Sequence, residues 1–303
     1  MVIGAGASGI MASITVKDSG KDVGILESKK RIGQKLLSTG NGRCNITNKY
    51  INYSRYHSKN PDFFKDTLDN FTLNDTITFF NSLGLPLTTL EKGRMYPLSL
   101  QASSVLDILK MSLEDRNTPI YLNSKVKYIV YTKKYFRIFC EDKLYESRKI
   151  ILCTGGKSAP DTGSDGSGFN ICKKLGHNII SPIPALVQLK LDYTRLKALS
   201  GVKFNGNVTL LIDNKIKEQD EGELLFTDYG ISGPPILNIS GTASYNLLKK
   251  RLVEVEIDML PQFSEKELIE FLENHWGTLS YRSLHNSLIG IINKKIIPIL
   301  LNE

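Results

Sequence analysis

The sequence contains no long hydrophobic run. Nowhere in its 303 residues do about 18 apolar residues follow one another, the length that a membrane-spanning helix needs. A signal-peptide pattern is also missing, because Met1 leads directly into a glycine-rich segment. We therefore expect no membrane partner and a cytoplasmic location.

Cysteine and histidine are both scarce, with four of each. No two cysteines form a CxxC pair and no histidine neighbours a cysteine, so neither a zinc site nor a disulfide framework is indicated. We expect reduced thiols and no bound metal. The cysteines are Cys44, Cys140, Cys153 and Cys172, and the histidines are His57, His177, His275 and His285.

Acidic residues are fewer than basic ones, 31 against 39, which gives a net charge of +8 and a pI near 9.1. Such a balance is compatible with a nucleic-acid or anionic-substrate partner. A lysine-rich solvated surface explains the same numbers, and no RNA-binding signature with interleaved aromatic residues stands out. We favour the solvated surface and expect no nucleic-acid partner.

Glycine, in contrast, recurs near the N-terminus with the spacing of a known motif. MVIGAGASGI contains Gly4, Gly6 and Gly9 as GxGxxG, between a short apolar start and a helix-compatible stretch that reaches about Lys17. Gly4 permits a tight turn, Gly6 lets the backbone approach a pyrophosphate, and Gly9 lets helix and strand pack closely. The alternative is a glycine turn that serves packing alone.

The rest of this unit has the parts that a dinucleotide needs. The helix N-terminus, with Ala7 and Ser8, stabilises phosphate charge. A second apolar segment, DVGILES, ends at Glu27, whose carboxylate accepts hydrogen bonds from a ribose hydroxyl. Strand, glycine turn, helix, strand and acid together predict a dinucleotide-binding site.

Later segments favour FAD over NAD. Residues 124–130 are expected to form a β-strand, and Val126 lies where backbone usually holds an adenine. Ile150–Cys153 is expected to be a buried strand whose end brings bare backbone toward the first glycine turn. The residues at that end are Thr154, Gly155 and Gly156.

The stretch STGNGRCNITN, residues 38–48, is rich in glycine and asparagine. These residues tolerate left-handed backbone angles and disfavour both helix and strand. Something else must order the loop, and a ligand that contacts bare backbone beside Arg43 would do so. An ordinary surface loop is the alternative.

Five segments together resemble the BaiN-like (YhiN) flavoproteins, NAD(P)/FAD-dependent oxidoreductases of the glutathione-reductase-like FAD fold. They are IGAGASG, GQKLLSTGNGRCNITN, ILCTGGKSAPDTGSDGSGF, PALVQL and ELLFTDYGISGPPILNIS. The resemblance covers nearly the whole chain, and KLLSTGNGRCNITN is its most specific element. It implies an α/β fold with a Rossmann-like FAD-binding domain, an inserted β-rich barrel-like domain and a small helical domain.

The resemblance also implies roles for the loop after the second strand. In such flavoproteins the loop passes along the FAD pyrophosphate and the flavin, and the planar side chain of Arg43 suits an anion. Cys44 is expected to be a small buried residue. The residues expected to offer backbone N–H groups or polar side chains to FAD are Lys35, Thr39, Gly40, Asn41, Gly42, Arg43 and Asn45.

The chain is expected to form three domains. Residues 1–185 form the FAD-binding domain, with a helical insertion at about 50–118 that has helix-like stretches at 61–68 and 74–83. Residues 103–116 form an amphipathic helix.

Residues 186–260 form the inserted β-rich domain, in which KIKEQ and ELLFTD are expected to be separate strands. Residues 261–303 form the helical domain, which begins with a capping box of Ser264 and Glu267.

The family normally returns to the FAD fold near the C-terminus with a glycine-acid segment, and no such segment precedes Glu303. We expect a truncated chain in which the closing segment is absent and FAD is held weakly. The family also has histidine more often at the place of Asp228, so no catalytic base is carried over there.

The leading hypothesis is an enzyme, an FAD-dependent oxidoreductase that transfers hydride between reduced flavin and an organic substrate. NAD(P)H is the expected transient donor, and the resemblance suggests reduction of a conjugated carbon–carbon double bond, with a small-molecule partner. No catalytic acid is identified; Arg43 and Tyr229 are the candidates. The alternatives are an RNA-associated flavoprotein and a non-catalytic relative that has lost tight FAD binding.

Overall fold

The computed structural model describes residues 1–56, 58, 60 and 62–302. Its contacts divide the chain into two compact units, Met1–Ile180 and Ser181–Glu303. His57, Pro61 and Glu303, which the sequence analysis singled out, lie outside the described residues. The three-domain division with boundaries at 185 and 260 stays a prediction.

The first unit is built on a parallel sheet with the strand order β10-β1-β2-β6. Strand β1 pairs in parallel with both β2 and β10, so the first strand lies in the interior of the sheet. Helix α1, Ala7–Asp18, connects β1 to β2 and gives the expected strand, glycine turn, helix and strand. The sheet strands are β1 Val2–Ile3, β2 Ile25–Leu26, β6 Ile120–Tyr121 and β10 Ile151–Leu152.

The expectation of a buried strand at 150–153 is wrong in one respect. β10 pairs only with β1 among the described residues, so it lies at the edge of the sheet. Ile151 is 38% exposed as a result. The apolar letters of this segment do not distinguish an edge strand from an interior one, because that depends on which strands flank it.

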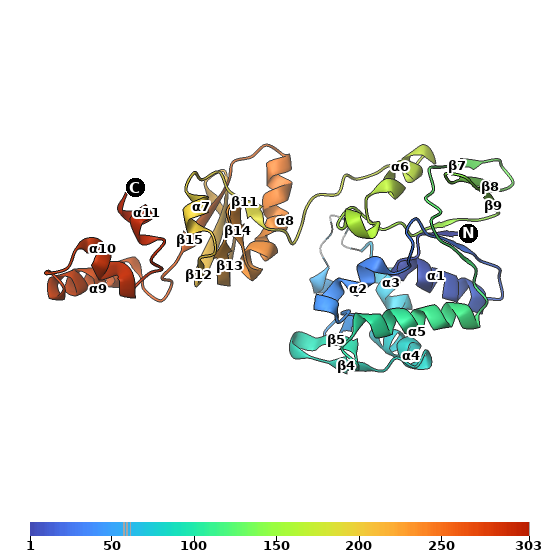
Figure 1. Ribbon diagram of the computed structural model, residues 1–303, viewed down its shortest axis with the longest axis horizontal. Coiled ribbons are helices and arrows are strands. Elements are labelled where there is room, and N and C mark those ends of the chain that lie inside the picture. Colours follow the sequence, from blue (N-terminus) through green and yellow to red (C-terminus); the bar gives the residue numbers. More distant parts are fainter. Residues whose placement is uncertain (57, 59, 61, 303) are drawn as a thin grey trace. The chain divides into compact units, whose positions relative to one another are not determined.

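Helix α5, Ala102–Asp115, packs beside α1 in the first unit (Figure 1). Its apolar residues recur every three or four positions, so they share one face of the helix. Val105, Leu109 and Leu113 are almost completely buried. The expected amphipathic helix at 103–116 is thus confirmed to within one residue at each end.

The helical insertion contributes two strands, β4 and β5, to a small antiparallel sheet whose third strand, β3, precedes the insertion. Helices α3, Lys65–Asn70, and α4, Leu73–Ser82, correspond to the two helix-like stretches. A capping box between Thr72 and Asp75 starts α4. The sheet has the order β3-β5-β4, with bounds β3 Thr47–Asn48, β4 Leu87–Thr89 and β5 Arg94–Pro97.

A three-stranded antiparallel meander and helix α6, Ser167–Lys174, complete the first unit. Ile138 lies fully buried in the centre of the meander's inner face, where it packs with Leu26 of the parallel sheet. The strand expected at 124–130 begins later, and Val126 lies in the segment that precedes it. The meander strands are β7 Tyr128–Tyr131, β8 Phe136–Phe139 and β9 Leu144–Ser147.

The second unit contains a five-stranded antiparallel sheet with the order β11-β14-β13-β12-β15. Helix α8, Pro234–Leu248, packs on this sheet and has proline in its first turn, where the missing N–H costs nothing. Ile236 and Ile239 of α8 join the core that Leu210 and Leu224 form on the sheet. The strands are β11 Leu189–Lys190, β12 Lys203–Ile212, β13 Lys215–Phe226, β14 Gly230–Ser232 and β15 Val253–Asp258.

The two strands expected at KIKEQ and ELLFTD are one continuous strand, β13. No turn interrupts it, because Gly222 pairs with Gly206 of β12 and the ladder continues through Asp220 and Glu221. Glu218 and Asp220 within this strand are half-buried, and they accept hydrogen bonds from the side chains of Thr242 and Asn238 on α8.

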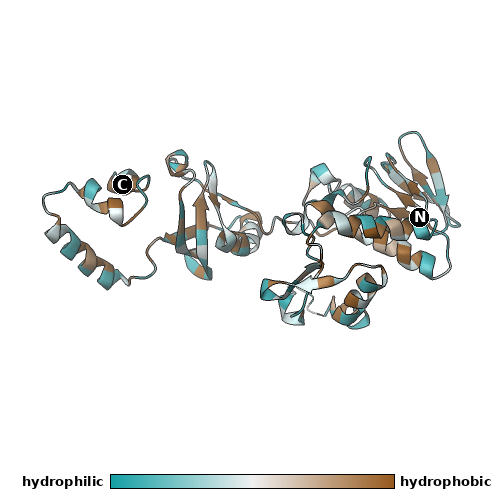
Figure 2. Cartoon of the chain, turned by 60° about the horizontal axis from the view of Figure 1, so that its bottom comes forward, coloured by the Kyte–Doolittle hydropathy of each residue, from teal (hydrophilic) through white to brown (hydrophobic). Residues whose placement is uncertain are grey.

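The C-terminal part of the second unit is helical. Helix α9, Glu265–Thr278, has the expected capping box of Ser264 and Glu267, and in Figure 2 it alternates between hydrophilic and hydrophobic turns. The short helices are α7 Leu196–Leu199, α10 Leu284–Ser287 and α11 Ile297–Leu301 in this unit, and α2 Gln34–Leu37 in the first.

Candidate functional site

The three motif glycines meet three different surroundings. A Cβ atom on Gly4 would lie 2.4 Å from the carbonyl oxygen of Cys153, and Gly4 has a φ of +101°. A Cβ atom on Gly9 would lie 1.8 Å from the carbonyl oxygen of Gly4. A Cβ atom on Gly6 would meet nothing within 4 Å, and the φ of Gly6 is −80°. Gly4 and Gly9 are therefore needed by the turn itself, whereas Gly6 borders open space.

The first turn of α1 is arranged to receive an anion. Gly6 is the N-cap, no side chain caps the helix, and its first turn contains no acidic residue. Ala7 and Ser8 are exposed. The backbone N–H groups at this end carry the positive end of the helix dipole, and they have no protein acceptor within the helix.

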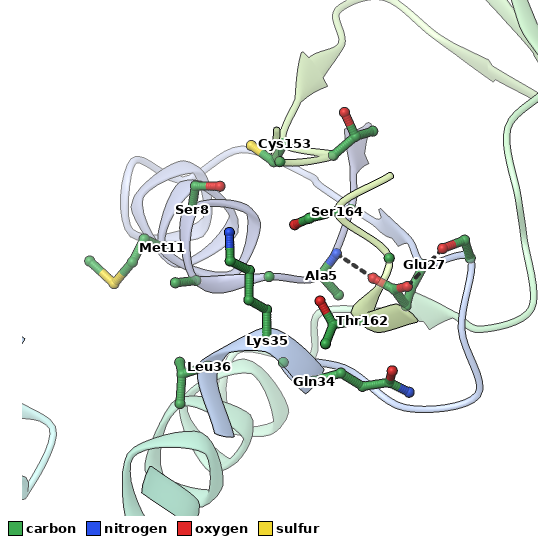
Figure 3. Close-up of a pocket in the computed structure, with 18 of the residues that line it drawn as sticks. Ala5, Ser8, Met11, Glu27, Gln34, Lys35, Leu36, Cys153, Thr162 and Ser164 are labelled. Carbon is green, nitrogen blue, oxygen red and sulfur yellow. Dashed lines mark hydrogen bonds between the residues drawn. The ribbon is translucent and has the colours of Figure 1, made fainter. Parts of the chain in front are cut away.

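Glu27 fixes the turn on its other side. Its side chain is buried, and Oε2 accepts a hydrogen bond from the backbone N–H of Ala5 at 2.8 Å (Figure 3). Oε1 accepts from the N–H of Lys29 at 2.8 Å and from the hydroxyl of Ser28 at 3.2 Å. A carboxylate oxygen can accept two hydrogen bonds, so Oε2 retains one free position toward the cavity.

These groups border a cavity of about 520 Å³ in the first unit. One end is polar and lies between the glycine turn, Glu27 and the loop that precedes α6. The other end is apolar and is formed by side chains from α1, α2, α4, α5 and the loop before β3. The apolar residues are Met11, Leu36, Ile46, Phe80, Val105 and Leu109.

Three lysines connect the loop after β10 to other segments around the cavity. The Lys35 side chain extends toward the start of α1 (Figure 3). Its Nζ donates to the Ser158 hydroxyl at 2.6 Å. The Nζ atom of Lys29 donates to the carbonyl of Asp161 at 3.1 Å. Lys125 pairs with Asp165 at 3.4 Å. Lys35 lines the cavity wall, as do Arg31 and Lys125.

Part of the stretch at 38–48 adopts the left-handed backbone that its composition suggested, whereas its last two residues, Thr47 and Asn48, form strand β3. Gly40, Asn41, Gly42 and Cys44 all have φ between +55° and +77°. Two of these residues are not glycine, which is uncommon for the left-handed region. Thr39 and Asn45 line the cavity, whereas residues 40–43 are exposed and do not belong to the lining.

Two thiols line the cavity. Cys44 is buried, as expected, and burial raises the pKa of its thiol, while a hydrogen bond with Thr39 opposes the shift. Burial also raises the pKa of the Cys153 thiol, opposed by a hydrogen bond with Ser8. All four cysteines are free. Raised pKa values favour the neutral thiol at physiological pH.

The structure gathers most of the predicted cofactor-binding residues around one cavity. Gly9 lies in the packing behind the turn, and Gly156 follows the strand end outside the lining. Residues 40–43 lie outside the lining too, and their contact with a cofactor stays a prediction. The predicted residues that line the cavity are Gly4, Gly6, Ala7, Ser8, Glu27, Lys35, Thr39, Asn45, Val126, Thr154 and Gly155.

The two catalytic candidates, Arg43 and Tyr229, belong to different units. Arg43 is exposed, and Tyr229 is 44% exposed with its hydroxyl donating to the side-chain oxygen of Gln188. Their catalytic role stays a prediction.

Sequence reasoning missed part of the polar wall. Ala5 contributes its N–H to Glu27, and the turn at Thr162, Gly163 and Ser164 forms the wall opposite the glycine turn. Ser164 is buried beside Gly155, where a Cβ atom would lie 2.6 Å from the serine Oγ. The glycine-rich string DTGSDGSG could have predicted this part of the wall, because it places bare backbone immediately before a helix.

No helix within the described residues is long and apolar enough to span a membrane. The described residues also contain no group of histidine, cysteine and acidic side chains that could hold a metal ion.

The chain matches two family models along its whole length. Residues 1–232 match the HI0933-like protein Rossmann domain, and residues 183–303 match the HI0933-like protein barrel and H2TH domain. The expected Rossmann-type fold with a barrel-like part is confirmed.

Relatives with assigned functions match over most of the chain. A 3-dehydro-bile acid delta(4,6)-reductase from Clostridium scindens is 38% identical over 99% of this chain and 74% of the relative. A ribosomal RNA dihydrouridine synthase from Haemophilus influenzae is 30% identical over 89% of this chain and 69% of the relative. Among solved structures, the open conformation of a flavocytochrome c3 fumarate reductase aligns with a TM-score of 0.44 and 18% identity, over 67% of this chain and 46% of that one.

The 38% identity to a reductase over nearly the whole chain confirms the expectation of an enzyme of the oxidoreductase class. The matches also confirm the resemblance that the five sequence segments indicated. The chain belongs to the HI0933-like family, the flavoprotein family that includes the bile acid reductase.

Proposed function

We propose that the first unit binds FAD in its cavity and that the protein is an FAD-dependent oxidoreductase that reduces a conjugated carbon–carbon double bond of an organic substrate. The observation that carries this proposal is the open space at Gly6. It faces an uncapped helix N-terminus and borders a cavity of about 520 Å³, within the range of cofactor sites.

The residues present fit FAD at the polar end of the cavity. The N–H groups of the first α1 turn would hold the pyrophosphate, and Lys35 would neutralise part of its charge. Glu27 would accept a hydrogen bond from a ribose hydroxyl at the free position on Oε2. Val126, which is buried in the cavity wall, would border the adenine.

The bound flavin would supply hydride transfer, and the protein would supply its position and surroundings. Met11, Leu36 and Phe80 exclude water from the apolar end of the cavity. Cys44 would remain a neutral thiol there, because burial raises its pKa. Overall, NAD(P)H and one proton are consumed as the double bond becomes a single bond.

The names of the relatives support a reductase and point to two substrate classes. The bile acid reductase is the more similar relative, so we propose a small-molecule substrate of low polarity. The proposal also includes NAD(P)H as donor and a cytoplasmic location, of which four free cysteines are typical. The residue division 1–185, 186–260 and 261–303 is proposed as well.

The visible spectrum of the purified protein, titrated with FAD, tests cofactor binding. NADH and NADPH are then added separately under anaerobic conditions, and bleaching of the flavin band identifies the donor. A conjugated enone added afterwards should restore the band. Absence of FAD binding would overturn the proposal, whereas binding without bleaching would remove NAD(P)H from it.

A further inference from the structure

Strand β15 forms one edge of the five-stranded sheet in the second unit. It pairs with β12 on one side, and no strand of the described chain pairs with its outer edge. Its six residues, Val253–Asp258, include neither proline nor glycine, whereas the opposite edge strand, β11, has only two residues. An edge of this kind can pair with another chain, because its backbone groups have no partner. β15 is long enough and regular enough to do so.

The backbone of β15 presents hydrogen-bonding groups along this edge. The Asp213 N–H donates to the Leu252 carbonyl at 3.0 Å, so the backbone of Leu252 is directed toward β12. Alternate residues of a strand direct their backbone groups to opposite edges. The N–H and C=O groups of Val253, Val255 and Ile257 therefore point away from β12, toward the free edge. An extended peptide laid along β15 would find these groups ready to pair.

One face of β15 leaves apolar surface uncovered at the edge. Val253, Val255 and Ile257 pack against the core of the second unit, but each is only half-buried. Val208 and Leu210, which lie opposite Ile257 and Val255 on β12, are completely buried because strands flank β12 on both sides. A further strand with apolar side chains on this face would complete the burial, which is favourable in water.

The other face of β15 has a row of carboxylates. Glu254, Glu256 and Asp258 are all exposed. Among the described residues no ion pair involves any of the three. Like charges on one face of a sheet repel one another, so a strand that brings cations to this face would be favoured. The residues opposite the three carboxylates on β12 are uncharged: Leu211, Thr209 and Asn207.

We propose that β15 binds an extended protein segment with alternating basic and apolar residues, which adds to the sheet as a further strand. Addition of a strand to a free edge combines backbone hydrogen bonds for affinity with alternate side chains for specificity. The apolar side chains of the segment would cover the open edge of the core, and its lysines or arginines would lie beside the carboxylates. The inference does not depend on the cofactor proposal.

A second copy of β15 does not fit the same edge. Two β15 strands would pair with their apolar residues on one face, and this arrangement places the carboxylates of both strands together on the other face. Like charges opposite each other destabilise a strand pair. The charge pattern therefore selects a partner of opposite sign.

The test is fluorescence anisotropy with a labelled peptide of alternating lysine and valine, about seven residues long, which is the length of an ordinary strand. The full chain is titrated into the peptide, and saturable binding is expected. The net charge of +8 on the chain opposes non-specific attraction of a basic peptide, so binding requires a local acidic surface. A peptide with the same lysines and valines in two separate blocks should bind at least about tenfold more weakly, because it cannot place the two residue types on opposite faces.

Two variants of β15 examine the two parts of the contact. Glu254→Lys/Glu256→Lys should weaken binding of the lysine–valine peptide about tenfold, since attractive pairs become repulsive ones. The same variant should gain binding to a glutamate–valine peptide, a gain that a folding defect would not produce. Val255→Pro removes an N–H at the free edge, where proline is tolerated, and should weaken the binding of both peptides to their matching proteins.

The matched control is Glu270→Lys/Glu273→Lys, which reverses two exposed carboxylates on α9. It should leave peptide binding unchanged, and thermal unfolding should show that every variant folds. Absence of saturable binding, equal binding of the alternating and block peptides, or equal effects of β15 and control variants would overturn the proposal. A dimer of the chain in sedimentation that Val255→Pro dissociates would overturn it in favour of a second copy.

Discussion

Gly4, Gly6 and Gly9 share one sequence motif, but their side-chain positions differ in what they face. Gly4 and Gly9 have backbone oxygens within 2.4 Å and 1.8 Å of an added Cβ atom, whereas Gly6 has none. Valine at position 6 would not strain the turn, because a φ of −80° is open to any residue.

Gly6→Val should therefore abolish FAD binding and leave the protein folded. The new side chain would occupy the space beside the α1 N-terminus, where the pyrophosphate is proposed to lie. FAD titration should show no binding. The free energy of unfolding of the FAD-free protein, measured with urea, should stay within about 0.5 kcal/mol of that of the parent. Gly9→Val is the control and should unfold the first unit. Full FAD binding by Gly6→Val would place the cofactor elsewhere.

Glu27→Ala should lower both FAD affinity and the stability of the FAD-free chain. The substitution removes the acceptor of the Ala5 N–H, and a buried donor without a partner costs about 1–3 kcal/mol. Urea unfolding without FAD measures that loss, and titration measures the affinity. Ser28→Ala, which removes only the 3.2 Å contact, is the control. Unchanged stability of Glu27→Ala would show that water replaces the carboxylate.

Alkylation of Cys44 and Cys153 should be slower than alkylation of free cysteine. The alkylation rate of both residues should increase with pH only at a higher pH than it does for free cysteine. The thiolate is the reactive form, and burial raises both pKa values. A raised folded-state pKa contributes stability below the ordinary thiol pKa, and this stability is lost as pH rises through the raised value. Mass spectrometry of iodoacetamide-treated protein follows each site. Rapid alkylation at neutral pH would contradict a buried neutral thiol.

At the scale of elements, the capping boxes show where local sequence is sufficient. Ser264 and Glu267 form the predicted box that starts α9, because each side chain bonds to a backbone N–H only three residues away. No distant contact is needed for this arrangement. Strand boundaries behave differently, as β13 and β10 show: their extent and exposure depend on the strands beside them.

Ser264→Ala should destabilise α9 by about 1 kcal/mol, the usual cost of losing an N-cap. Hydrogen bonds from Ser264 lower the pKa of Glu267, so this stabilisation is present above the ordinary glutamate pKa and is lost as pH falls through the lowered value. Amide exchange in the first turn of α9 should therefore differ less between parent and variant at acidic pH. Ser283→Ala is the control, since the cap of α10 has no carboxylate partner. If the stability lost by Ser264→Ala did not depend on pH, the Glu267 carboxylate would not contribute to the cap.

At the scale of the whole molecule, the cavity lining belongs to a single unit. All of its residues lie between Ile3 and Ile171, before the division after Ile180. The chain that follows α6 has no regular secondary structure between residues 177 and 188. Ile180 is 94% exposed there, and Leu186 is 70% exposed.

Limited digestion with subtilisin should cut first between residues 178 and 186. The separated N-terminal fragment should bind added FAD as the intact chain does, because every cavity-lining residue lies in it. Mass spectrometry identifies the cut, and the visible spectrum of the fragment reports the flavin. A first cut within either unit, or loss of FAD from an intact N-terminal fragment, would contradict the assignment of the whole site to the first unit.

The sequence alone determined the parts of the site that depend on near neighbours in the chain. The spacing of Gly4, Gly6 and Gly9, the acid at Glu27, the left-handed residues 40–42 and the capping box at Ser264 are local features, so residue type and spacing suffice to identify them. The motif resemblance identified the family for the same reason.

The tertiary structure decided which distant segments meet. It placed the Thr162–Ser164 turn opposite the glycine turn, brought Ser158 to Lys35, and put β10 at a sheet edge. It also set Tyr128 against Phe139 on an exposed face, although the two are eleven positions apart in the chain. Such contacts follow from strand order and register, which are properties of the whole packing rather than of any one segment.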